Sequence, residues 1–537
     1  MHRSDADSAI RTCPLRRTTL SRRALLTGSA AALLACRTRS LWGQQQKDPF
    51  ALGVASGYPT PDGAVLWTRL APEPLFPDPE RPGGMPPTTV PVEWEVAADQ
   101  RMQQIVRRGT EHADPQFAHS VHVECRGLEP GREYWYRFIA GGETSQIGRL
   151  RTAPARGATL DRLRFGFVSC AHYELGYFSA YRHLAAEDPD LILFLGDYIY
   201  EYVSGWRGTV RQHSDGVEAT DLRTYRNRHA QYKTDPDLRA LHAAVPCLAT
   251  WDDHEVQNDY ADDRSMAFVD PLDFLARRAA AYQAYWEHMP LPHWAKPRGP
   301  DMTLFCRADF GELATFLIAD GRQYRSPLAC DVPPRGGGKA LIDGSCPERL
   351  DPRRSYLGKG QEAWLYREFH RAPARWNILA QGQLMTEFKE RLPSGQMSHW
   401  SEDWNGYPAA RQRLLGQIVE TRLPNPVVIG GDLHSFWAND LKLDFDSPGA
   451  PVIASEFVGT SVTSNGPPYD KFAGWLDDNP HVHFFDSRKR GYVSAELRPE
   501  RLEVAFRALA DVRDPDTTVS TLRRFVVEDG RPGPRPL

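Results

Sequence analysis

The sequence predicts an α/β protein in which an all-β domain precedes a larger domain of alternating strands and helices. Between about Phe50 and Pro154 the chain consists of short alternating runs separated by Pro, Gly and Asp, which is typical of an all-β sandwich. Further along, the pattern changes to strand, helix, strand, which is typical of a parallel sheet. Four apolar runs in this second part end in polar residues, so we expect the chemistry at one edge of that sheet.

The composition limits the classes of function. The chain has 537 residues, of which 41% are hydrophobic and 25% charged, as in a globular protein of several domains. The formal net charge is −4, and no stretch forms a basic stripe. These values exclude a dedicated nucleic-acid-binding protein, although a nucleic acid is not excluded as a substrate.

Residues 1–48 are expected to be a signal peptide, because several arginines precede an apolar segment at Ala24–Ala35. That segment is too short to predict a membrane span, so no transmembrane segment is expected in the mature chain. The stretch Ser21–Leu26, SRRALL, resembles a twin-arginine signal, which predicts the twin-arginine translocase as a partner and a periplasmic or secreted location. A chance arginine pair ahead of a general secretory signal is the alternative. A lipid anchor at Cys36, which follows Leu-Leu-Ala, is also left open.

The first domain is expected at residues 50–155, as a β-sandwich of about 100 residues. Its segment Gly127–Phe138, GLEPGREYWYRF, resembles the late strands of a fibronectin type III or immunoglobulin-like sandwich, in which a turn precedes an aromatic-rich strand. We expect this domain to pack against or orient the rest of the protein. Binding of a carbohydrate or another surface is the alternative.

The second domain is expected at residues 160–510. A strand at Leu163–Ser169, a helix at Phe178–Glu187 and a strand at Leu191–Leu195 form its first βαβ unit. The same patterns predict helices at Pro271–His288, Gln361–Arg371 and Ala409–Leu423, and strands at Leu313–Asp320 and Trp376–Gln381. Two strands within Arg490–Leu509 are expected to close the sheet. Residues 511–537 are expected to be a C-terminal segment with a loose Pro-rich tail after Glu528.

The segment Arg325–Leu357 is rich in Pro and Gly, and its length predicts either an ordered excursion near the site or a mobile lid. Its GGGK stretch lacks the spacing of a phosphate-binding loop. Six cysteines follow the signal peptide, and Cys330 and Cys346, which flank this loop, are the best candidates for a disulfide in an oxidising compartment. Cys170 is left out of any pairing, because it stands at a strand end beside His172.

Four apolar runs that end in polar residues form the candidate site. They are LRFGFVSCAH (Leu163–His172), LILFLGDYIY (Leu191–Tyr200), VPCLATWDDHE (Val245–Glu255) and NPVVIGGDLH (Asn425–His434). Open α/β sheets keep their chemistry at the carboxyl ends of the strands. The Cys, Asp, Tyr and His residues at these four ends therefore predict one polynuclear metal site.

Asp197 is the strongest candidate ligand, since a carboxylate directly after a buried strand can bridge two cations with its two oxygens. Tyr200 offers a phenolate, which favours a trivalent metal. Cys170 offers a thiolate, whose deprotonation a cation would drive. The alternatives are a capping or turn role for Asp197, a packing role for Tyr200, and a small apolar role for Cys170.

Two other motifs add carboxylates and imidazoles. WDDHE places Asp252, Asp253 and His254 in succession, a density of charge that is costly to bury without a cation. A solvated acidic turn is the alternative. GGDLH places Asp432 and His434 two residues apart, on one side of an extended chain. The two preceding glycines permit close approach of a ligand to the backbone.

Together these motifs resemble the calcineurin-like metallophosphoesterase superfamily and, within it, the PhoD-type alkaline phosphatases. The resemblance rests on Ser169–Cys170, Gly196–Tyr202 (GDYIYEY), Trp251–Glu255 and Gly431–His434, and also on Leu52–Gly57 (LGVASG) and Asp320–Ser326 (DGRQYRS). It covers roughly residues 50–510. The fold that it implies for the second domain is a two-sheet α/β sandwich of metallophosphoesterase type.

The resemblance implies an Fe(3+) site with Ca(2+) ions beside it. By position, the iron ligands would be Cys170, Asp197, Tyr200 and His434, with Asp197 shared between metals. Calcium would be bound by Asp253 and Asp432, in keeping with its preference for oxygen donors. Asp252 is left open as a further ligand or as a residue that orients the ligands, and His172 is left open as an orienting residue.

The activity implied by the resemblance is that of an exported alkaline phosphatase. It would hydrolyse phosphate esters by attack of a metal-activated water or oxo group, without a covalent enzyme intermediate. His254 would stabilise or protonate the leaving oxygen, and Arg322 and Arg325 would clamp the phosphate unless they are surface arginines. The alternatives are a phosphodiesterase or phospholipase D-like enzyme with the same metal site, and an exported binding protein with a degenerate catalytic domain. A monomer is expected.

Overall fold

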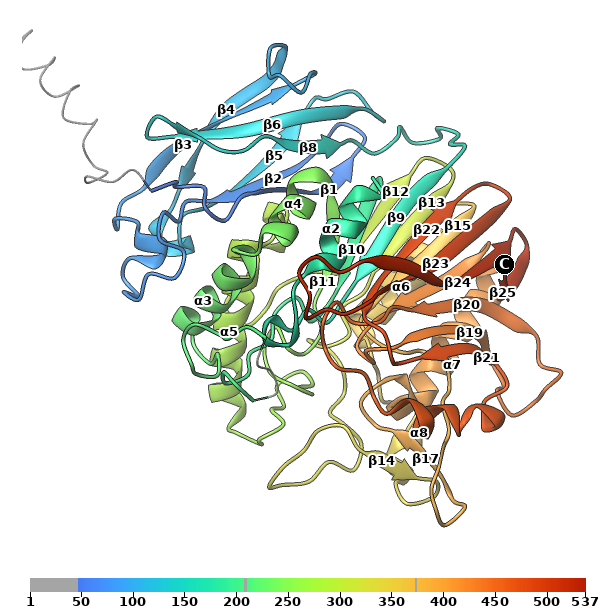
Figure 1. Ribbon diagram of the computed structural model, residues 1–537. Helices are drawn as coiled ribbons and strands as arrows, with labels where there is room; N and C mark the ends of the chain where they lie inside the picture. The colour runs from blue at the N-terminus through green and yellow to red at the C-terminus, as the bar shows by residue number, and fades with distance from the viewer. Residues whose placement is uncertain (1–46, 207–209, 372–373) are drawn as a thin grey trace, which may run out of the picture. The chain divides into compact units, whose positions relative to one another are not determined.

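The computed structural model describes residues 47–206, 210–371 and 374–537. The predicted signal peptide, apart from its last two residues, lies outside these ranges, as do its paired arginines and Cys36. Within the described ranges, no helix is both long enough and apolar enough to cross a membrane. Figure 1 shows strands that converge on one region from two sheets, with helices beside them.

The larger sheet has ten strands. In spatial order they are β25 (Arg531–Pro536), β24 (Val519–Glu528), β23 (Arg501–Leu509), β22 (Gly491–Leu497), β9 (Leu163–Val168), β10 (Leu191–Leu195), β11 (Cys247–Thr250), β1 (Val54–Thr60), β2 (Gly63–Arg69) and β5 (Ser120–Arg126). Strands β9, β10 and β11 are parallel neighbours. They are almost entirely buried and apolar, as expected of strands covered on both faces. Their carboxyl ends therefore lie at one edge of the sheet.

A second sheet has seven strands. In spatial order they are β12 (Cys306–Phe310), β13 (Ala314–Ile318), β15 (Trp376–Ala380), β18 (Pro426–Gly430), β20 (Val452–Val458), β19 (Phe436–Lys442) and β21 (Val482–Asp486). Strands β13, β15, β18 and β20 run parallel. The two sheets share one hydrophobic core, in which the rings of Phe165 and Phe316 pack edge to face with their centroids 5.2 Å apart.

The alternation of side chains along its strands explains how the second sheet packs against the first sheet on one face and against helices on the other. Phe316 and Ile378 face the core shared with the first sheet. Their neighbours Leu317 and Leu379 face the opposite way and pack with α6 (Lys359–His370) and α7 (Pro408–Thr421). On the first sheet, Leu184 of α2 (Ser179–Ala186) lies so close to Gly166 that a Cβ there would be 2.5 Å away. The layers are therefore helix, sheet, sheet, helix.

The predicted helices are confirmed to within two residues at each end. The longest, α5 (Pro271–His288), has the predicted limits. The loop between the second and third strand ends also contains α3 (Leu222–Lys233) and α4 (Pro236–Ala244). The side chain of Asp221 caps α3 by accepting from Thr224 N at 2.8 Å, which satisfies one of the unpaired N–H groups of its first turn.

The N-terminal region is all-β, but its strands belong to two sheets of different extent. One sheet contains only strands of this region, namely β3 (Val90–Ala97), β4 (Ile105–Ala113), β6 (Glu133–Ala140), β7 (Glu143–Thr144) and β8 (Gly148–Arg151). Strands β1, β2 and β5 instead extend the ten-stranded sheet, since Gly57 of β1 pairs with Cys247 of β11. Backbone pairing therefore crosses the expected border at residue 155.

The tail after Glu528 is not loose, so that expectation is wrong. Strands β22 and β23 are the two predicted there, but β24 and β25 add to the sheet beyond them. Phe525 of β24 is buried in the shared core. The prolines of β25 are tolerated because this strand is at the edge of the sheet, where an N–H can be missing without loss of a ladder hydrogen bond.

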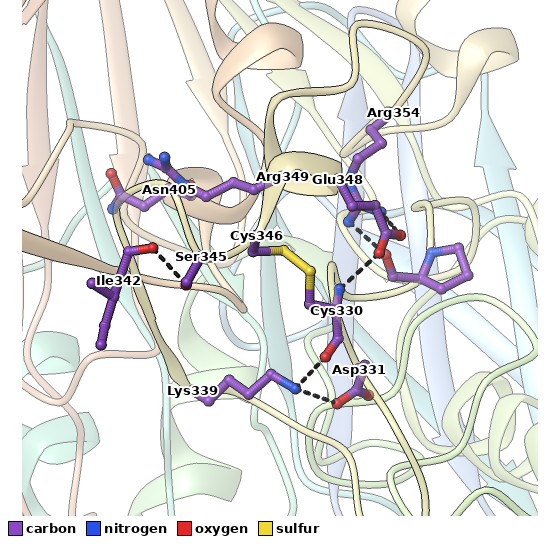
Figure 2. The surroundings of a disulfide bond; sticks show 11 residues. Cys330, Asp331, Lys339, Ile342, Ser345, Cys346, Glu348, Arg349, Arg354 and Asn405 are labelled. Carbon is purple, nitrogen blue, oxygen red and sulfur yellow. Dashed lines mark hydrogen bonds and ion pairs between the residues drawn. A yellow bond between two sulfur atoms is a disulfide. The ribbon is translucent and has the colours of Figure 1, made fainter.

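The segment Arg325–Leu357 is an ordered excursion, one of the two predicted alternatives. Cys330 and Cys346 form the predicted disulfide. Figure 2 shows Lys339 Nζ donating to Cys330 O at 2.6 Å, and Glu348 Oε2 accepting from Cys330 N at 2.8 Å. These bonds hold the backbone of Cys330, on one side of the disulfide, to other residues of the loop.

The excursion also reaches the region where the strand ends meet. Its strand β14 (Ala340–Ile342) forms a small sheet with β17 (Met397–Trp400) and β16 (Glu390–Arg391). Gly338 N donates to Asp259 Oδ2 at 2.8 Å. Backbone from this loop therefore helps to hold an acidic side chain that follows the WDDHE motif.

Candidate metal centre

The four predicted strand ends meet at one place. Cys170 follows β9, Asp197 follows β10, Asp252 follows β11, and Asp432 follows β18 of the second sheet. The first two turns are joined by backbone hydrogen bonds, in which Cys170 N donates to Gly196 O at 3.2 Å. The four strand ends therefore come together, but they belong to two sheets and not to one edge of a single sheet.

The backbone is left-handed at four of the seven candidate ligands. The φ angle is 60° at Cys170, 52° at Asp197, 63° at Asp432 and 51° at His434. Non-glycine residues seldom adopt this conformation, which costs on the order of 1–3 kcal/mol each and tends to occur at functional sites. Gly196, at φ 100°, also has no room for a side chain, because a Cβ there would lie 2.4 Å from that of Asp252.

One group of ligand atoms contains sulfur, oxygen and nitrogen. Ligand atoms of Cys170, Asp197 and His434 all lie within 4.8 Å of one another. The hydroxyl of Tyr200 donates to Asp197 Oδ2 at 2.9 Å and lies 3.1 Å from His434 Nε2. His434 Nδ1 lies 2.8 Å from Asn465 O, which places the proton on Nδ1 and leaves Nε2 as the ligand atom.

A second set of groups consists mainly of carboxylates. Asp252, Asp253 and Asp432 offer oxygens within 4.8 Å of one another. Asp253 also belongs to a group with Asp197 and His254, and to another with Asp259 and Glu402. Asp197 and Asp253 thus connect the mixed-donor group to the carboxylate groups, as expected of bridging ligands.

Arg322 lies among these carboxylates and is not a surface arginine. Its side chain is 0% exposed. Its Nε contacts Asp252 Oδ1, its Nη1 contacts Glu402 Oε1, and its Nη2 lies 3.5 Å from Asp253 Oδ1. Arg325 is also buried, and its Nη1 donates to Glu402 Oε1 at 3.1 Å. These contacts favour a role in positioning the carboxylates over the predicted direct clamping of a phosphate.

The balance of buried charge favours bound cations. Burial, followed by the charge of Glu402, raises the pKa of Asp432 well above its usual value. Burial raises the pKa of Asp252 to about 6 and that of Asp259 to about 7. Asp252 Oδ2 is buried and accepts no hydrogen bond from the described part of the chain. A divalent or trivalent cation would offset this repulsion and supply a partner for that oxygen.

The Cys170 thiol is in an environment where only a cation would stabilise its thiolate. Burial, followed by the charges of Asp197 and Asp432, raises the pKa of this thiol well above its usual value. Its Sγ donates to Ser169 Oγ at 3.3 Å. A coordinating metal deprotonates a thiol in such a position, so the donor set fits a transition metal.

His254, which belongs to one of the ligand groups, is held by the carboxylate of Glu201, which belongs to none of them. Its Nδ1 lies 2.7 Å from Glu201 Oε2, and its ring lies 4.1 Å from that of Tyr200. His172 packs on the same tyrosine, with ring centroids 4.5 Å apart. His172 therefore supports Tyr200 from outside the ligand groups.

Sequence reasoning missed four acidic residues of this region, namely Glu201, Glu255, Asp259 and Glu402. Glu255 is fully buried and accepts from Asp197 N at 3.1 Å, Tyr198 N at 2.5 Å and Asp252 N at 2.8 Å, which clamps two of the strand-end turns together. Glu201 lies inside the motif GDYIYEY, and Glu255 lies inside the motif WDDHE. An acidic residue within a motif of otherwise buried residues was the available signal.

The centre opens into a cavity of about 420 Å³. Asp259, Glu402, Asp432 and His434 line one part of it. An apolar wall faces them, formed by Leu384, Phe388, Trp400, Leu433 and Phe472. Asp432 and His434 are therefore accessible to a substrate that has an apolar part.

Comparisons with known proteins agree with this geometry. The family model described as PhoD-like phosphatase matches residues 165–506, and that of its N-terminal domain matches residues 35–154. The chain is 44% identical over 494 residues to alkaline phosphatase D of Bacillus subtilis (strain 168), which covers 91% of this chain and 82% of that protein. A solved structure named "Structure of PhoD" superposes with a TM-score of 0.86 at 44% identity, over 92% of this chain and 93% of that one. The chain belongs to the PhoD-like phosphatase family.

Proposed function

We propose that the chain is an exported, metal-dependent alkaline phosphatase that hydrolyses phosphate esters. The observation that carries the proposal is the convergence of Cys170, Asp197 and His434, whose ligand atoms lie within 4.8 Å of one another beside a group of carboxylates. The relationship to alkaline phosphatase D supports the reaction class. Intact ligand groups argue against an exported binding protein with a degenerate site.

We assign the metals from the chemistry of the donors. Thiol, phenol and imidazole donors suit a transition metal, so Fe(3+) would be held by Cys170, Asp197, Tyr200 and His434. Oxygen donors suit calcium, so Ca(2+) would be held by Asp252, Asp253 and Asp432, with Asp259 and Glu402 as further oxygen donors. Bound cations would neutralise charge on the phosphate oxygens and lower the pKa of a water molecule that attacks the phosphorus.

The chain's own residues have two further tasks in this proposal. His254, held through Nδ1 by Glu201, would donate a proton from Nε2 to the leaving oxygen. Arg322 would keep Asp252 and Asp253 in place by contacts with both carboxylates. Clamping of the substrate phosphate is thereby assigned to the metal centre and not to Arg322.

The proposal also includes the architecture of the two parts of the chain. Residues 160–510 would form a two-sheet sandwich of metallophosphoesterase type, since two sheets share one core with helices outside them. Residues 50–155 would correspond to the immunoglobulin-like part. Export by the twin-arginine translocase and a monomeric state are carried over from the sequence as further parts of the proposal.

A phosphodiesterase activity of the same centre is the second candidate. The cavity of about 420 Å³ has an apolar wall that includes Trp400 and Phe472, so it offers a place for an alcohol group beside the phosphate. A lipid or a polymer could supply such a group. This observation favours a diester without excluding a monoester.

The test combines elemental analysis of the purified protein with a substrate panel. We expect iron and calcium in the protein, and release of phosphate or alcohol from at least one class of ester. Faster turnover of diester than of monoester model substrates would establish the second candidate. Absence of iron from every active preparation would refute the iron assignment, and absence of hydrolysis with metal bound would refute the proposed function.

A further inference from the structure

A second cavity, of about 560 Å³, adjoins the metal centre. It shares Asn465 and Gly466 with the cavity that contains Asp432 and His434. Gly466 lies at the border between the two cavities and has no room for a side chain. A Cβ at this position would lie 2.7 Å from both His434 O and Arg490 Nη2. One residue of backbone therefore stands between a candidate metal ligand and the second cavity.

The second cavity is basic, and we call it the basic groove. Its lining contains four cationic side chains and one carboxylate, namely Arg488, Lys489, Arg490, Arg513 and Asp511. Arg513 pairs with Asp511 at 2.7 Å, and Arg488 pairs with Asp486 at 2.6 Å. Lys489 is exposed and, within the described ranges, has no carboxylate at ion-pair distance. The groove therefore carries an excess of positive charge.

Arg490 adds a buried charge to the floor of this groove. Its exposed fraction is 9%. Its Nη1 donates to Ser461 Oγ at 3.0 Å, and its Nη2 donates to Ser487 O at 2.6 Å. These acceptors are neutral, and in the described part of the chain no carboxylate pairs with Arg490. The charge of Asp486 acts on Arg490 from beyond ion-pair distance. Because no described carboxylate contacts the buried guanidinium directly, an anion in the groove would offset part of the cost of burying it.

The other cavity has no such excess of positive charge. Away from the metal ligands it is lined by one lysine, Lys471, by the acidic residues Glu390 and Asp403, and by the apolar wall. A second anionic group of a substrate would therefore interact more favourably with the basic groove than with this cavity. The two cavities thus give a direction to any substrate that carries a second negative charge.

We propose that the basic groove binds a second phosphate group of the substrate. This inference rests on the proposed function and names its substrate class, namely organic phosphates in which the leaving alcohol carries a further phosphate monoester or diester. The first phosphate lies at the metal centre, and the second reaches past Asn465 and Gly466 to Lys489, Arg490 and Arg513. Both phosphates interact with cations, but only the first is hydrolysed in that binding mode.

The experiment compares two substrates of equal chain length, propyl phosphate and 1,3-propanediol bisphosphate, with the metal-loaded protein. The variants are Lys489→Gln, Arg513→Gln and the double variant, which alter exposed side chains outside the catalytic machinery. Arg353→Gln is the matched control, because Arg353 pairs with Asp351 at 2.6 Å two residues away, as Arg513 does with Asp511, but lines neither cavity.

We expect the wild-type protein to prefer the bisphosphate, with a preference that falls as salt is added. In the double variant KM for the bisphosphate should rise about tenfold, while kcat and the KM for propyl phosphate change less than twofold. The control should behave as wild type. An equal rise in KM for both substrates, or no rise for either, would overturn the proposal.

A binding measurement separates this inference from the proposed function. Calorimetric titration of the bisphosphate into wild type and double variant needs no turnover. If neither substrate is hydrolysed but the affinity still differs about tenfold, the groove is supported and the proposed function fails. If the affinities are equal, the groove does not bind the second phosphate, whatever the activity.

Discussion

His254 Nδ1 lies 2.7 Å from Glu201 Oε2, and both side chains are buried. Glu201 is itself fixed, because its Oε1 accepts from Asn258 N at 2.8 Å. Burial alone would lower the pKa of His254, but the charge of Glu201, followed by Asp197 and Asp253, raises it well above its usual value. These charges therefore favour the protonated imidazole, which is the state that a leaving-group acid needs.

Glu201→Gln should move the alkaline limb of the pH profile of kcat to lower pH. The substitution removes the negative charge that stabilises the imidazolium, so the pKa of His254 falls and its proton is lost earlier as the pH rises. The glutamine can still accept from Asn258 N, which preserves the fold. The measurement is kcat from about pH 6 to pH 11, and an unchanged alkaline limb would contradict the role given to His254.

Tyr200→Phe should change the iron site more than the fold. The hydroxyl donates to Asp197 Oδ2 and accepts from Ser464 Oγ at 2.8 Å, so its loss removes a donor atom from the mixed group. We expect lower iron content and loss of the visible band from phenolate-to-iron charge transfer. Tyr202→Phe is the control, since Tyr202 donates to Asn258 Oδ1 at 2.6 Å. An identical spectrum in Tyr200→Phe would exclude this tyrosine as a ligand.

Arg322→Met distinguishes a positioning arginine from a phosphate clamp. Its contacts with Asp252 and Glu402 are fully buried, and removal of one partner from a buried ion pair costs about 3–5 kcal/mol. The free energy of unfolding of the metal-free protein should fall by about that amount, and calcium should restore part of it. Denaturant unfolding with and without calcium provides the measurement. Arg353→Met, at an exposed pair, should leave the free energy of unfolding almost unchanged.

The same variant has a second possible result. If Arg322→Met left the free energy of unfolding unchanged and raised only KM, the arginine would contact the substrate. The sequence prediction of a clamp would then be correct, and the positioning role would be wrong.

Much of this site could be predicted because its signals are local in the sequence. The run LILFLGD identifies a buried strand and the carboxylate that ends it, and β10 does end just before Asp197. Helix α5 has the predicted limits because Asp270 caps it and Pro271 occupies its first position.

The parts that could not be predicted depend on contacts distant in the sequence. Glu402 is distant in the sequence from the four strand ends and contacts Arg322, so no local pattern marks it. Glu201 stands inside GDYIYEY, but its partner His254 is 53 residues away, so the motif does not reveal the contact. The pairing of Gly57 with Cys247, and the addition of β24 to β23, are likewise set by tertiary packing. A Pro-rich tail has a low intrinsic preference for strands, but β25 pairs with β24, whose Phe525 is buried in the core.

Lys233→Met should change how stability depends on pH. Lys233 is buried with Nζ 4.3 Å from the centre of the Trp67 ring, and burial lowers its pKa to about 7. The folded pKa is below that of the unfolded chain, about 10.4, so the wild type loses stability as the pH falls from about 10 to 7. Methionine does not titrate, so the variant does not lose stability in this pH range through this position. Urea unfolding should show that the variant is more stable than the wild type at pH 7, and that this difference is largely absent at pH 10. An equal difference in the free energy of unfolding at both pH values would contradict the burial of a neutral lysine.

Asp197→Asn tests the metal centre through its bridging ligand. Asparagine tolerates the left-handed backbone, so the turn after β10 should persist while the shared charge is lost. Asp188→Asn is the matched control, because Asp188 has a φ of 51° but an exposed side chain that pairs with Arg149. The control should retain its metals and its activity.

The most direct measurement is metal content and phosphate release determined on the same preparations of wild type and Asp197→Asn. We predict bound iron and calcium with release of phosphate in the wild type, and loss of metal with a fall in kcat of about a thousandfold or more in the variant. An Asp197→Asn protein that retained its metals and full turnover would contradict the assignment of the reaction to this centre.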